Sequence, residues 1–277
     1  DMKQIAKYYD DTGLIDYFGV VGSGCDTHNT LANVIPNMSY PPEPFLHLAA
    51  GIKEVVSVPV IHAQNIKDPN QAKRIIEAGY VDFVGMTRAH IADPHIVRKI
   101  IEKREDEIRP CVGANYCLDR IYQGGSAYCI HNAATGREET MPHQIPKAET
   151  RKKVVIVGAG PGGLEAARVA GERGHEVVVF EAASQPGGQV RLTSQNERRK
   201  EMISIIEWRM AQCERLGIKF HFDTWAEAEE VNAENPDVVI IATGGLPHTD
   251  VLTQGNELVV SAWDIISGDV KPGKNVL

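Results

Sequence analysis

Residues 154–163 read VVIVGAGPGG, four apolar residues followed by a glycine-rich loop. The glycines at 158, 160 and 163 match the pattern G-x-G-x-x-G directly after a predicted strand. Gly158 allows a tight turn, Gly160 lets the backbone approach a pyrophosphate, and Gly163 lets the following helix pack against the strand. Pro161 suits the first turn of that helix, because its missing N–H costs nothing there. The stretch therefore predicts a βαβ unit that binds a dinucleotide at a helix N-terminus.

Three motifs further along the chain strengthen this prediction. Glu181 ends the next predicted strand, where a carboxylate can accept the hydroxyls of an adenosine ribose and disfavours a 2′-phosphate. A second glycine motif follows at 187–189, and a late strand over 238–242 ends in a turn of small residues. The predicted dinucleotide-binding residues are Gly158, Gly160, Pro161, Gly162, Gly163, Glu181, Gly187, Gly188, Gln189, Ala242, Thr243 and Gly244.

This set of motifs resembles the FAD-binding half of flavoproteins that contain two dinucleotide-binding domains. The resemblance spans nearly all of residues 151–277 and implies a Rossmann-like domain that holds FAD, or ADP as the alternative. Residues 271–276 resemble the start of the second, NAD-type domain of those proteins. We therefore expect the chain to be a fragment of a longer polypeptide.

The bulk composition argues against several classes of partner. The chain has 29 Lys and Arg against 37 Asp and Glu, a net charge of -8, and no long block of one sign. We therefore expect no nucleic-acid partner. No apolar run reaches the roughly 20 residues needed to cross a bilayer, and no secretion signal is present. We expect no membrane association and a cytoplasmic location.

The first hundred residues alternate short apolar strands with amphipathic helices. Strands are predicted over 15–21, 58–63 and 81–86, and helices over 44–56, 69–78 and 94–103. Strands separated by helices indicate parallel βαβ units. Three such units fit the closing part of a (β/α)8 barrel, although they could equally lie in an open sheet.

Residues 106–150 interrupt this alternation and carry three closely spaced cysteines, Cys111, Cys117 and Cys129. In a chain without a secretion signal, such crowding favours a metal or redox role over a disulfide framework. The cysteines and the run 132–138 resemble the iron–sulfur segment of the family of 2,4-dienoyl-CoA reductase, trimethylamine dehydrogenase and histamine dehydrogenase. In that family four cysteines enclose a 4Fe–4S cluster, since soft anionic sulfur matches iron.

The sequence departs from the family pattern at Ala114, which stands where the second cysteine is expected and cannot coordinate iron. Three thiolates could hold a three-iron cluster, or a four-iron cluster with water or another outside ligand. Alternatively, the three cysteines pack as small apolar residues without a cluster. With Ala114 counted as the lost ligand, the spacing resembles the amine dehydrogenases, since the dienoyl-CoA reductases carry one residue more.

The front of the chain resembles the FMN barrel of the same family, which is similar to Old Yellow Enzyme. Its matching stretches, 63–66 and 85–94, correspond to the last two strand ends of that barrel. The resemblance assigns the FMN phosphate to Arg88, whose guanidinium fork matches a phosphate, and mostly backbone contacts to Gln64, Asn65 and Thr87. The alternative for Arg88 is a surface residue that caps the next helix.

The predicted fold class is α/β, with the C-terminal part of an FMN-binding TIM barrel over 1–105, a cysteine-containing connector over 106–150, and the Rossmann-like domain over 151–277. The resemblance implies an FMN- and FAD-dependent oxidoreductase in the intact protein, with the fragment alone inactive. Its catalytic residues are unknown, because the family's substrate-facing residues lie mostly upstream of Asp1.

For the intact protein we favour oxidative demethylation of a small amine through FMN. Electrons would then pass through a cluster toward the FAD or ADP domain and an electron-transfer partner. The alternatives are NAD(P)H-dependent reduction of an enoyl thioester, and a non-catalytic nucleotide-binding module. The sequence leaves the substrate and a homo-oligomeric state open.

Overall fold

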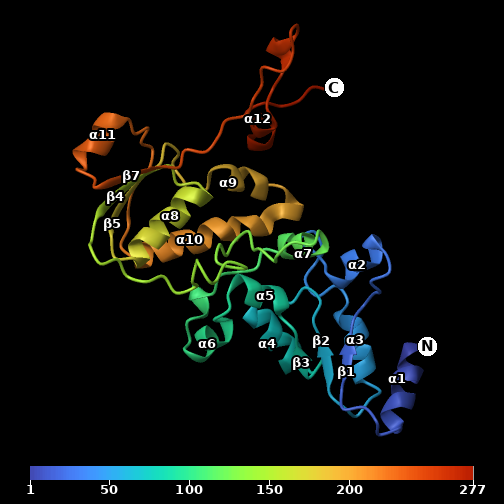
Figure 1. The fold of residues 1–277 in the computed structure, drawn as a ribbon. Helices are drawn as coiled ribbons and strands as arrows, with labels where there is room; N and C mark the ends of the chain where they lie inside the picture. The colour runs from blue at the N-terminus through green and yellow to red at the C-terminus, as the bar shows by residue number, and fades with distance from the viewer. Residues whose placement is uncertain (277) are drawn as a thin grey trace. The chain divides into compact units, whose positions relative to one another are not determined.

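The computed structural model describes residues 1–276, so Leu277, the last residue of the expected Rossmann-like domain, lies outside the described residues. The chain divides into two compact units, Asp1–His143 and Gln144–Leu277. Each unit contains its own parallel sheet (Figure 1). The segment expected as a connector is thus divided, with 106–143 in the first unit and 144–150 in the second. No helix within residues 1–276 is long and apolar enough to span a membrane.

The first unit is built on three parallel strands in the order of the chain. They are β1 (Phe18–Val20), β2 (Val60–His62) and β3 (Phe83–Val84), with β2 in the middle. Helices separate them along the chain, so each connection is a βα crossover. Neighbouring strands that follow the chain order are what the wall of a (β/α)8 barrel requires.

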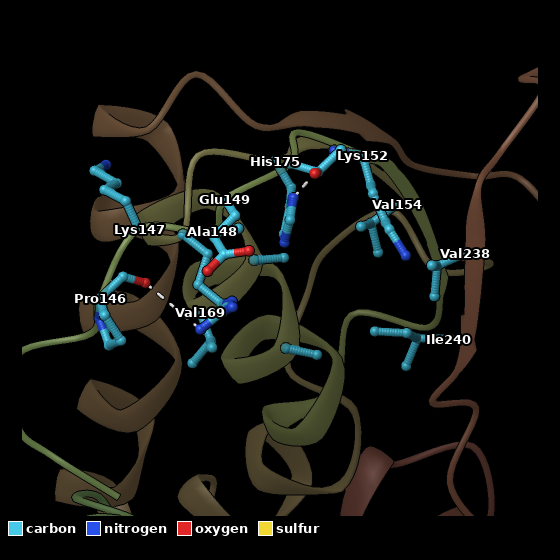
Figure 2. Close-up of a pocket in the computed structure, with 14 residues that line it drawn as sticks. Pro146, Lys147, Ala148, Glu149, Lys152, Val154, Val169, His175, Val238 and Ile240 are labelled. Atoms are coloured by element: carbon cyan, nitrogen blue, oxygen red, sulfur yellow. Dashed lines mark hydrogen bonds between the residues drawn. The ribbon is translucent and has the colours of Figure 1, made fainter.

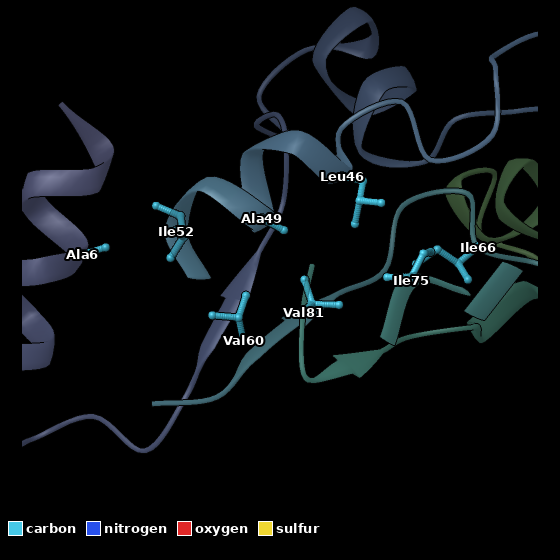
Figure 3. Close-up of a cluster of buried hydrophobic side chains, with 8 residues drawn as sticks. All are labelled: Ala6, Leu46, Ala49, Ile52, Val60, Ile66, Ile75 and Val81. Atoms are coloured by element: carbon cyan, nitrogen blue, oxygen red, sulfur yellow. The ribbon is translucent and has the colours of Figure 1, made fainter. Parts of the chain in front are cut away.

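The helices of the first unit cover this sheet and continue beyond it. They are α1 (Met2–Asp11), α2 (His28–Val34), α3 (Leu46–Lys53), α4 (Pro69–Glu77), α5 (Thr87–Ala92), α6 (Ile96–Ile101), the 3-10 turn η1 (Glu105–Glu107) and α7 (Tyr116–Tyr122). Figure 3 shows the core, in which side chains of α1, α3 and α4 meet those of β2 and the segments around it. Its buried members are Ala6, Leu46, Ala49, Ile52, Val60, Ile66, Ile75 and Val81.

The second unit contains a four-stranded parallel sheet in the order β6-β5-β4-β7. Its strands are β4 (Lys153–Val157), β5 (Glu176–Phe180), β6 (Lys219–His221) and β7 (Val238–Ile241). The chain moves outward from β4 through β5 to β6 and then returns to the other side of β4. The direction of the strand order therefore reverses at β4, and ligands bind at such a reversal in open α/β sheets.

The second unit also contains α-helices and 3-10 helices. They are α8 (Pro161–Glu172), α9 (Gly188–Ser194), the 3-10 helix η2 (Glu197–Ile203), α10 (Ser204–Arg215), α11 (Ala228–Ala233), η3 (Asn256–Leu258) and α12 (Ala262–Ser267). Figure 1 shows α8 and α10 side by side along the sheet. Val231 of α11 packs with Val155, Val178 and Phe180. Because these three strand positions share one side of the pleat, α11 covers the sheet opposite α8.

One helix predicted from the sequence needs correction, and another was not predicted. The sequence pattern predicts a single helix over 199–216, but the α-helix begins only at Ser204, because 197–203 form the 3-10 helix η2. The first residues of η2 are a charged run without the apolar spacing of a helix. The Asn196 side chain caps η2 by accepting from the Arg198 N–H at 3.0 Å. Helix α9 was not predicted, since it starts at a glycine pair with positive φ, Gly187 at 124° and Gly188, its first residue, at 49°.

Candidate functional site: two cofactor loops and a cysteine segment

The glycine loop after β4 has the tight contacts that its pattern predicts. Gly158 has a φ of 103°, and a Cβ there would lie 2.5 Å from the Ala242 carbonyl oxygen. A Cβ on Gly163 would lie 1.9 Å from the Gly158 carbonyl oxygen. A Cβ on Gly160, in contrast, would have no neighbour within 4 Å. Gly158 and Gly163 therefore serve close packing, while the backbone at Gly160 is open to an approaching ligand.

Helix α8 begins directly at this loop, with Gly160 as its N-cap and Pro161 in its first turn. Glycine has no side chain to cap the helix, so no side-chain oxygen occupies the first-turn N–H groups. These groups, together with the helix dipole, provide a binding position for an anion such as a pyrophosphate. Gly162 and Gly163 lie in that first turn.

The other dinucleotide motifs converge on the same loop. The Gly187 N–H donates to the Ala159 carbonyl at 2.9 Å, and a Cβ on Gly188 would lie 3.6 Å from Gly160 Cα. The Gln189 side chain donates to the Gly245 carbonyl at 3.2 Å. The turn at 242–244, which holds Thr243 and Gly244, follows β7 on the other side of the loop. The structure thus brings together motifs from three separate parts of the chain, the glycine loop at 158–163, the stretch 187–189 and the turn at 242–244.

Glu181 has a role in the structure that the sequence did not predict. Its carboxylate accepts from the Ala159 N–H at 2.6 Å and from the Ala183 N–H at 2.9 Å. The side chain therefore connects the glycine loop to the end of β5. Each carboxylate oxygen can accept a second hydrogen bond, so ribose recognition by Glu181 stays a prediction.

The predicted FMN residues follow β2 and β3 at the same edge of the first sheet. Gln64 is buried, and its side chain accepts from the Gly22 N–H at 2.6 Å and donates to the Asn33 carbonyl at 2.7 Å. Both ends of its side-chain amide are thus bonded within the protein, and a backbone contact of Gln64 with FMN stays a prediction. Thr87 is exposed at the start of α5.

Arg88 lies half-buried in α5, with its guanidinium held by two side-chain amides. It donates to Asn115 Oδ1 and, at 3.4 Å, to Asn65 Oδ1. Asn65 is itself buried, with a φ of 57° and a hydrogen bond of 3.1 Å from its Nδ2 to the Pro41 carbonyl. These two bonds use two of the five N–H donors of the guanidinium, which leaves others for a phosphate. The residues present therefore fit an anionic phosphate at this position.

The three clustered cysteines, Cys111, Cys117 and Cys129, act on one another electrostatically in the structure. Burial raises the pKa of the Cys111 and Cys117 thiols, and the charges of the two other cysteines raise that of Cys117 further. Nearby Arg88 opposes both shifts. The His131 N–H donates to Cys129 Sγ at 3.4 Å, and the backbone N–H groups of Gly113 and Leu118 act to lower the pKa of Cys111 and Cys117.

The donor set of this segment matches the family's four-cysteine cluster only in part. Ala114 presents a methyl group where a fourth ligand would be needed. Within residues 1–276, no group of three or more His, Cys, Asp or Glu side chains is arranged to hold a metal ion. The segment therefore offers at most three thiolates, and an iron–sulfur cluster at Cys111, Cys117 and Cys129 stays a prediction.

The run 132–138 fastens the cysteine segment to the helix that carries Arg88. The Asn132 amide donates to the Ile91 carbonyl at 3.3 Å, and the Thr135 hydroxyl donates to the same carbonyl at 2.9 Å. Ile91 lies in the last turn of α5, whose carbonyls lack partners within the helix. The motif therefore supplies a C-terminal cap for α5.

A cavity of about 730 Å³ lies elsewhere in the second unit (Figure 2). Figure 2 shows Val154, Val238 and Ile240 on its sheet side and His175 bonded to the Lys152 N–H, at 3.2 Å. The cavity adjoins the first residues of β4 and β7. Since cofactors of doubly wound folds bind at the opposite, carboxyl ends of the strands, this cavity is not the dinucleotide site.

Sequence reasoning missed Asn115, which contacts Arg88 from within the cysteine segment. Asn115 adopts a left-handed conformation with a φ of 57° directly before α7. Asparagine is one of the few residues that tolerate this conformation, so its place between Ala114 and an apparent helix start was the available signal.

Comparison with known proteins supports the division into two cofactor-binding parts. Residues 35–107 match the NADH:flavin oxidoreductase / NADH oxidase family, and residues 152–267 match the pyridine nucleotide-disulphide oxidoreductases. The chain is 68% identical to a probable N-methylproline demethylase of Rhizobium meliloti, over 99% of this chain and 40% of that protein. It is 60% identical to the N,N-dimethylglycine/sarcosine dehydrogenase of Chromohalobacter salexigens, over 100% of this chain and 41% of that protein.

Two solved structures resemble the chain over nearly its whole length. A 2-naphthoyl-CoA reductase complex has a TM-score of 0.88 at 33% identity, covering 98% of this chain and 41% of that one. Histamine dehydrogenase from Rhizobium sp. 4-9 has a TM-score of 0.85 at 25% identity, covering 98% of this chain and 40% of that one. The chain thus spans about two fifths of the length of the proteins it matches.

Fold and sites define a class of flavoprotein in which part of an FMN-type TIM barrel is joined to part of an FAD/NAD-type Rossmann-like domain. Within that class, the chain belongs to the family of 2,4-dienoyl-CoA reductase, trimethylamine dehydrogenase and histamine dehydrogenase.

Proposed function

We propose that the intact polypeptide is a flavin-dependent oxidoreductase that oxidatively demethylates a small N-methyl amine. The observation that carries this proposal is the identity of 68% and 60% to relatives named for N-methylproline demethylation and N,N-dimethylglycine/sarcosine dehydrogenation. The similarity to 2-naphthoyl-CoA reductase, at 33% identity, favours reduction of an unsaturated thioester as the second candidate.

The first unit would bind FMN through its phosphate. Arg88 would hold the phosphate as a guanidinium fork, with backbone contacts from Gln64, Asn65 and Thr87. Bound FMN would supply the acceptor for the hydride of a C–H bond next to the substrate nitrogen. Water then adds to the resulting iminium carbon, and the adduct releases formaldehyde and the demethylated amine.

The second unit would bind an adenine nucleotide, with FAD ahead of ADP. The open backbone at Gly160 and the uncapped start of α8 would receive the pyrophosphate. Glu181 would accept the ribose hydroxyls with the lone pairs that its two backbone bonds leave. The glycine motif at 187–189 and the turn at 242–244 complete the wall of this site.

For the cysteine segment we propose an iron–sulfur cluster held by Cys111, Cys117 and Cys129, with a ligand from outside the chain at the remaining position. Iron and acid-labile sulfide in the anaerobically purified, full-length protein test this proposal. Iron near zero would contradict it and leave the cysteines as packed apolar residues.

The proposed reaction is tested on the full-length protein with N-methylproline and N,N-dimethylglycine. We expect anaerobic bleaching of the flavin absorbance and one formaldehyde per demethylation. A preparation that instead oxidises NAD(P)H with an enoyl thioester would support the second candidate. A colourless preparation that releases ADP and no FAD would support a nucleotide-binding scaffold. We expect no turnover from the 277-residue chain alone.

A further inference from the structure

Asn115 links three parts of the first unit through one side chain. Its Oδ1 accepts from the guanidinium of Arg88, and its Nδ2 donates to the Ile35 carbonyl at 2.7 Å. Ile35 follows the last residue of α2, and Asn115 itself directly precedes α7. The side chain makes no capping bond to α7, although asparagine is a good capping residue. Its amide is therefore committed to Arg88 and Ile35.

This commitment fixes the plane of the Arg88 guanidinium. Asn115 Oδ1 meets Nη1, and Asn65 Oδ1 lies 3.4 Å from Nη2. An arginine side chain has several rotatable bonds, and ordering it costs conformational entropy. The hydrogen bonds from its two Nη atoms to Asn115 and Asn65 already restrict the Arg88 side chain before any ligand binds. The remaining donors are then oriented for a phosphate that would otherwise have to order the arginine itself.

We infer that Asn115 is a positioning residue for the FMN phosphate. Its side chain holds the Arg88 guanidinium and also ties the cysteine segment to the residue after α2. The inference rests on the proposed FMN site at Arg88. Removal of residues that orient a metal ligand typically weakens metal binding by 10- to 100-fold, and we expect an FMN affinity loss of about 10-fold here.

The test compares Asn115→Gly with Asn115→Asp in the full-length protein. Glycine keeps the left-handed backbone without strain and removes both side-chain bonds. Aspartate keeps an acceptor for Arg88 but replaces the donor to the Ile35 carbonyl with an oxygen and adds a negative charge. We expect Asn115→Gly to lower the FMN-to-FAD ratio and to raise the Kd for added FMN about 10-fold. Asn115→Asp should bind FMN within about threefold of the wild type, and both variants should keep their FAD.

Asn235→Gly is the matched control. Asn235 also has a positive φ, 49°, but its side chain bonds only to the nearby Ala233 carbonyl, at 3.3 Å, in the second unit. The Asn235→Gly variant should therefore bind FMN with wild-type affinity. If Asn115→Gly binds FMN with wild-type affinity, the inference is overturned. It is also overturned if Asn115→Asp loses as much FMN affinity as Asn115→Gly, since the acceptor for Arg88 would then not matter. A wild-type protein without FMN would instead refute the proposed function as well.

Discussion

At the residue scale, the three glycines of the loop pattern serve different purposes. Gly163 is needed because its position has no space for a Cβ, which would lie 1.9 Å from the Gly158 carbonyl oxygen. Gly160 has that space, with nothing within 4 Å. The absence of a side chain at Gly160 matters only if a ligand must come close to the backbone there. The fold thus requires glycine at 163, whereas the proposed nucleotide binding would require it at 160.

Alanine substitutions should separate these two requirements. Gly160→Ala should change the free energy of unfolding by no more than about 1 kcal/mol, the typical cost of a weaker N-cap, and lower nucleotide affinity at least about tenfold. Gly163→Ala should cost about 1–3 kcal/mol of stability, because backbone atoms cannot rotate away from the new methyl group. Thermal melts and quantification of released nucleotide measure both effects. Gly19→Ala, also without a neighbour within 4 Å, is the control. Wild-type nucleotide content in Gly160→Ala would argue against binding at this loop.

At the element scale, a buried ion cluster joins α8 to α10. Glu165 of α8 pairs with Arg209 of α10 at 2.9 Å and with Arg168 of its own helix at 2.6 Å. The side chains of both arginines are no more than 6% exposed. The cluster holds the helix whose first turn forms the proposed pyrophosphate site, so its loss should affect that site as well as the fold.

Removal of the shared carboxylate should be costly. Glu165→Ala removes the carboxylate that pairs with Arg209, while Arg168 keeps its pair with Glu172, and loss of one partner from a buried pair typically costs about 3–5 kcal/mol. Glu197→Ala, which removes an exposed pair with Lys200, should cost less than about 1 kcal/mol. Urea denaturation followed by circular dichroism gives both values. If both variants lose less than about 1 kcal/mol of unfolding free energy, the buried cluster contributes no more to stability than an exposed ion pair does.

At the scale of the whole molecule, the chain has a separate core in each unit. The cluster of Figure 3 contains residues from 6 to 81, and the cluster around Val155 contains residues from 155 to 231. The proposed FMN residues belong to the first unit and the proposed dinucleotide residues to the second. Each core would therefore support one of the two proposed sites, and damage to one core should leave the other site intact.

A core substitution tests this independence. Ile75 is fully buried in α4, and Ile75→Ala should destabilise the first unit by about 2–5 kcal/mol. Hydrogen exchange should accelerate within residues 1–143 and stay unchanged in β4, β5 and α8. Ile101→Ala, at a position 76% exposed, is the control with little expected effect. Equal loss of protection in both units would show that they unfold as one.

Sequence reasoning located the strands well because each combines apolar residues with a clear boundary. β4 and β5 occur where the patterns over 154–157 and 176–180 predict them. It failed at α9 and at the start of α10, where glycine conformation and local capping decide the outcome. It also missed Asn115, because its two partners, Ile35 and Arg88, are 80 and 27 residues away in the chain.

The sequence by itself determined that both units are α/β with parallel strands, since glycine spacing and strand periodicity are local patterns that reflect local sterics. Only the tertiary structure decided how the carboxylate of Glu181 is used and which residue holds Arg88. Hydrogen bonds between distant segments depend on where folding places their donors and acceptors. No local pattern specifies that placement.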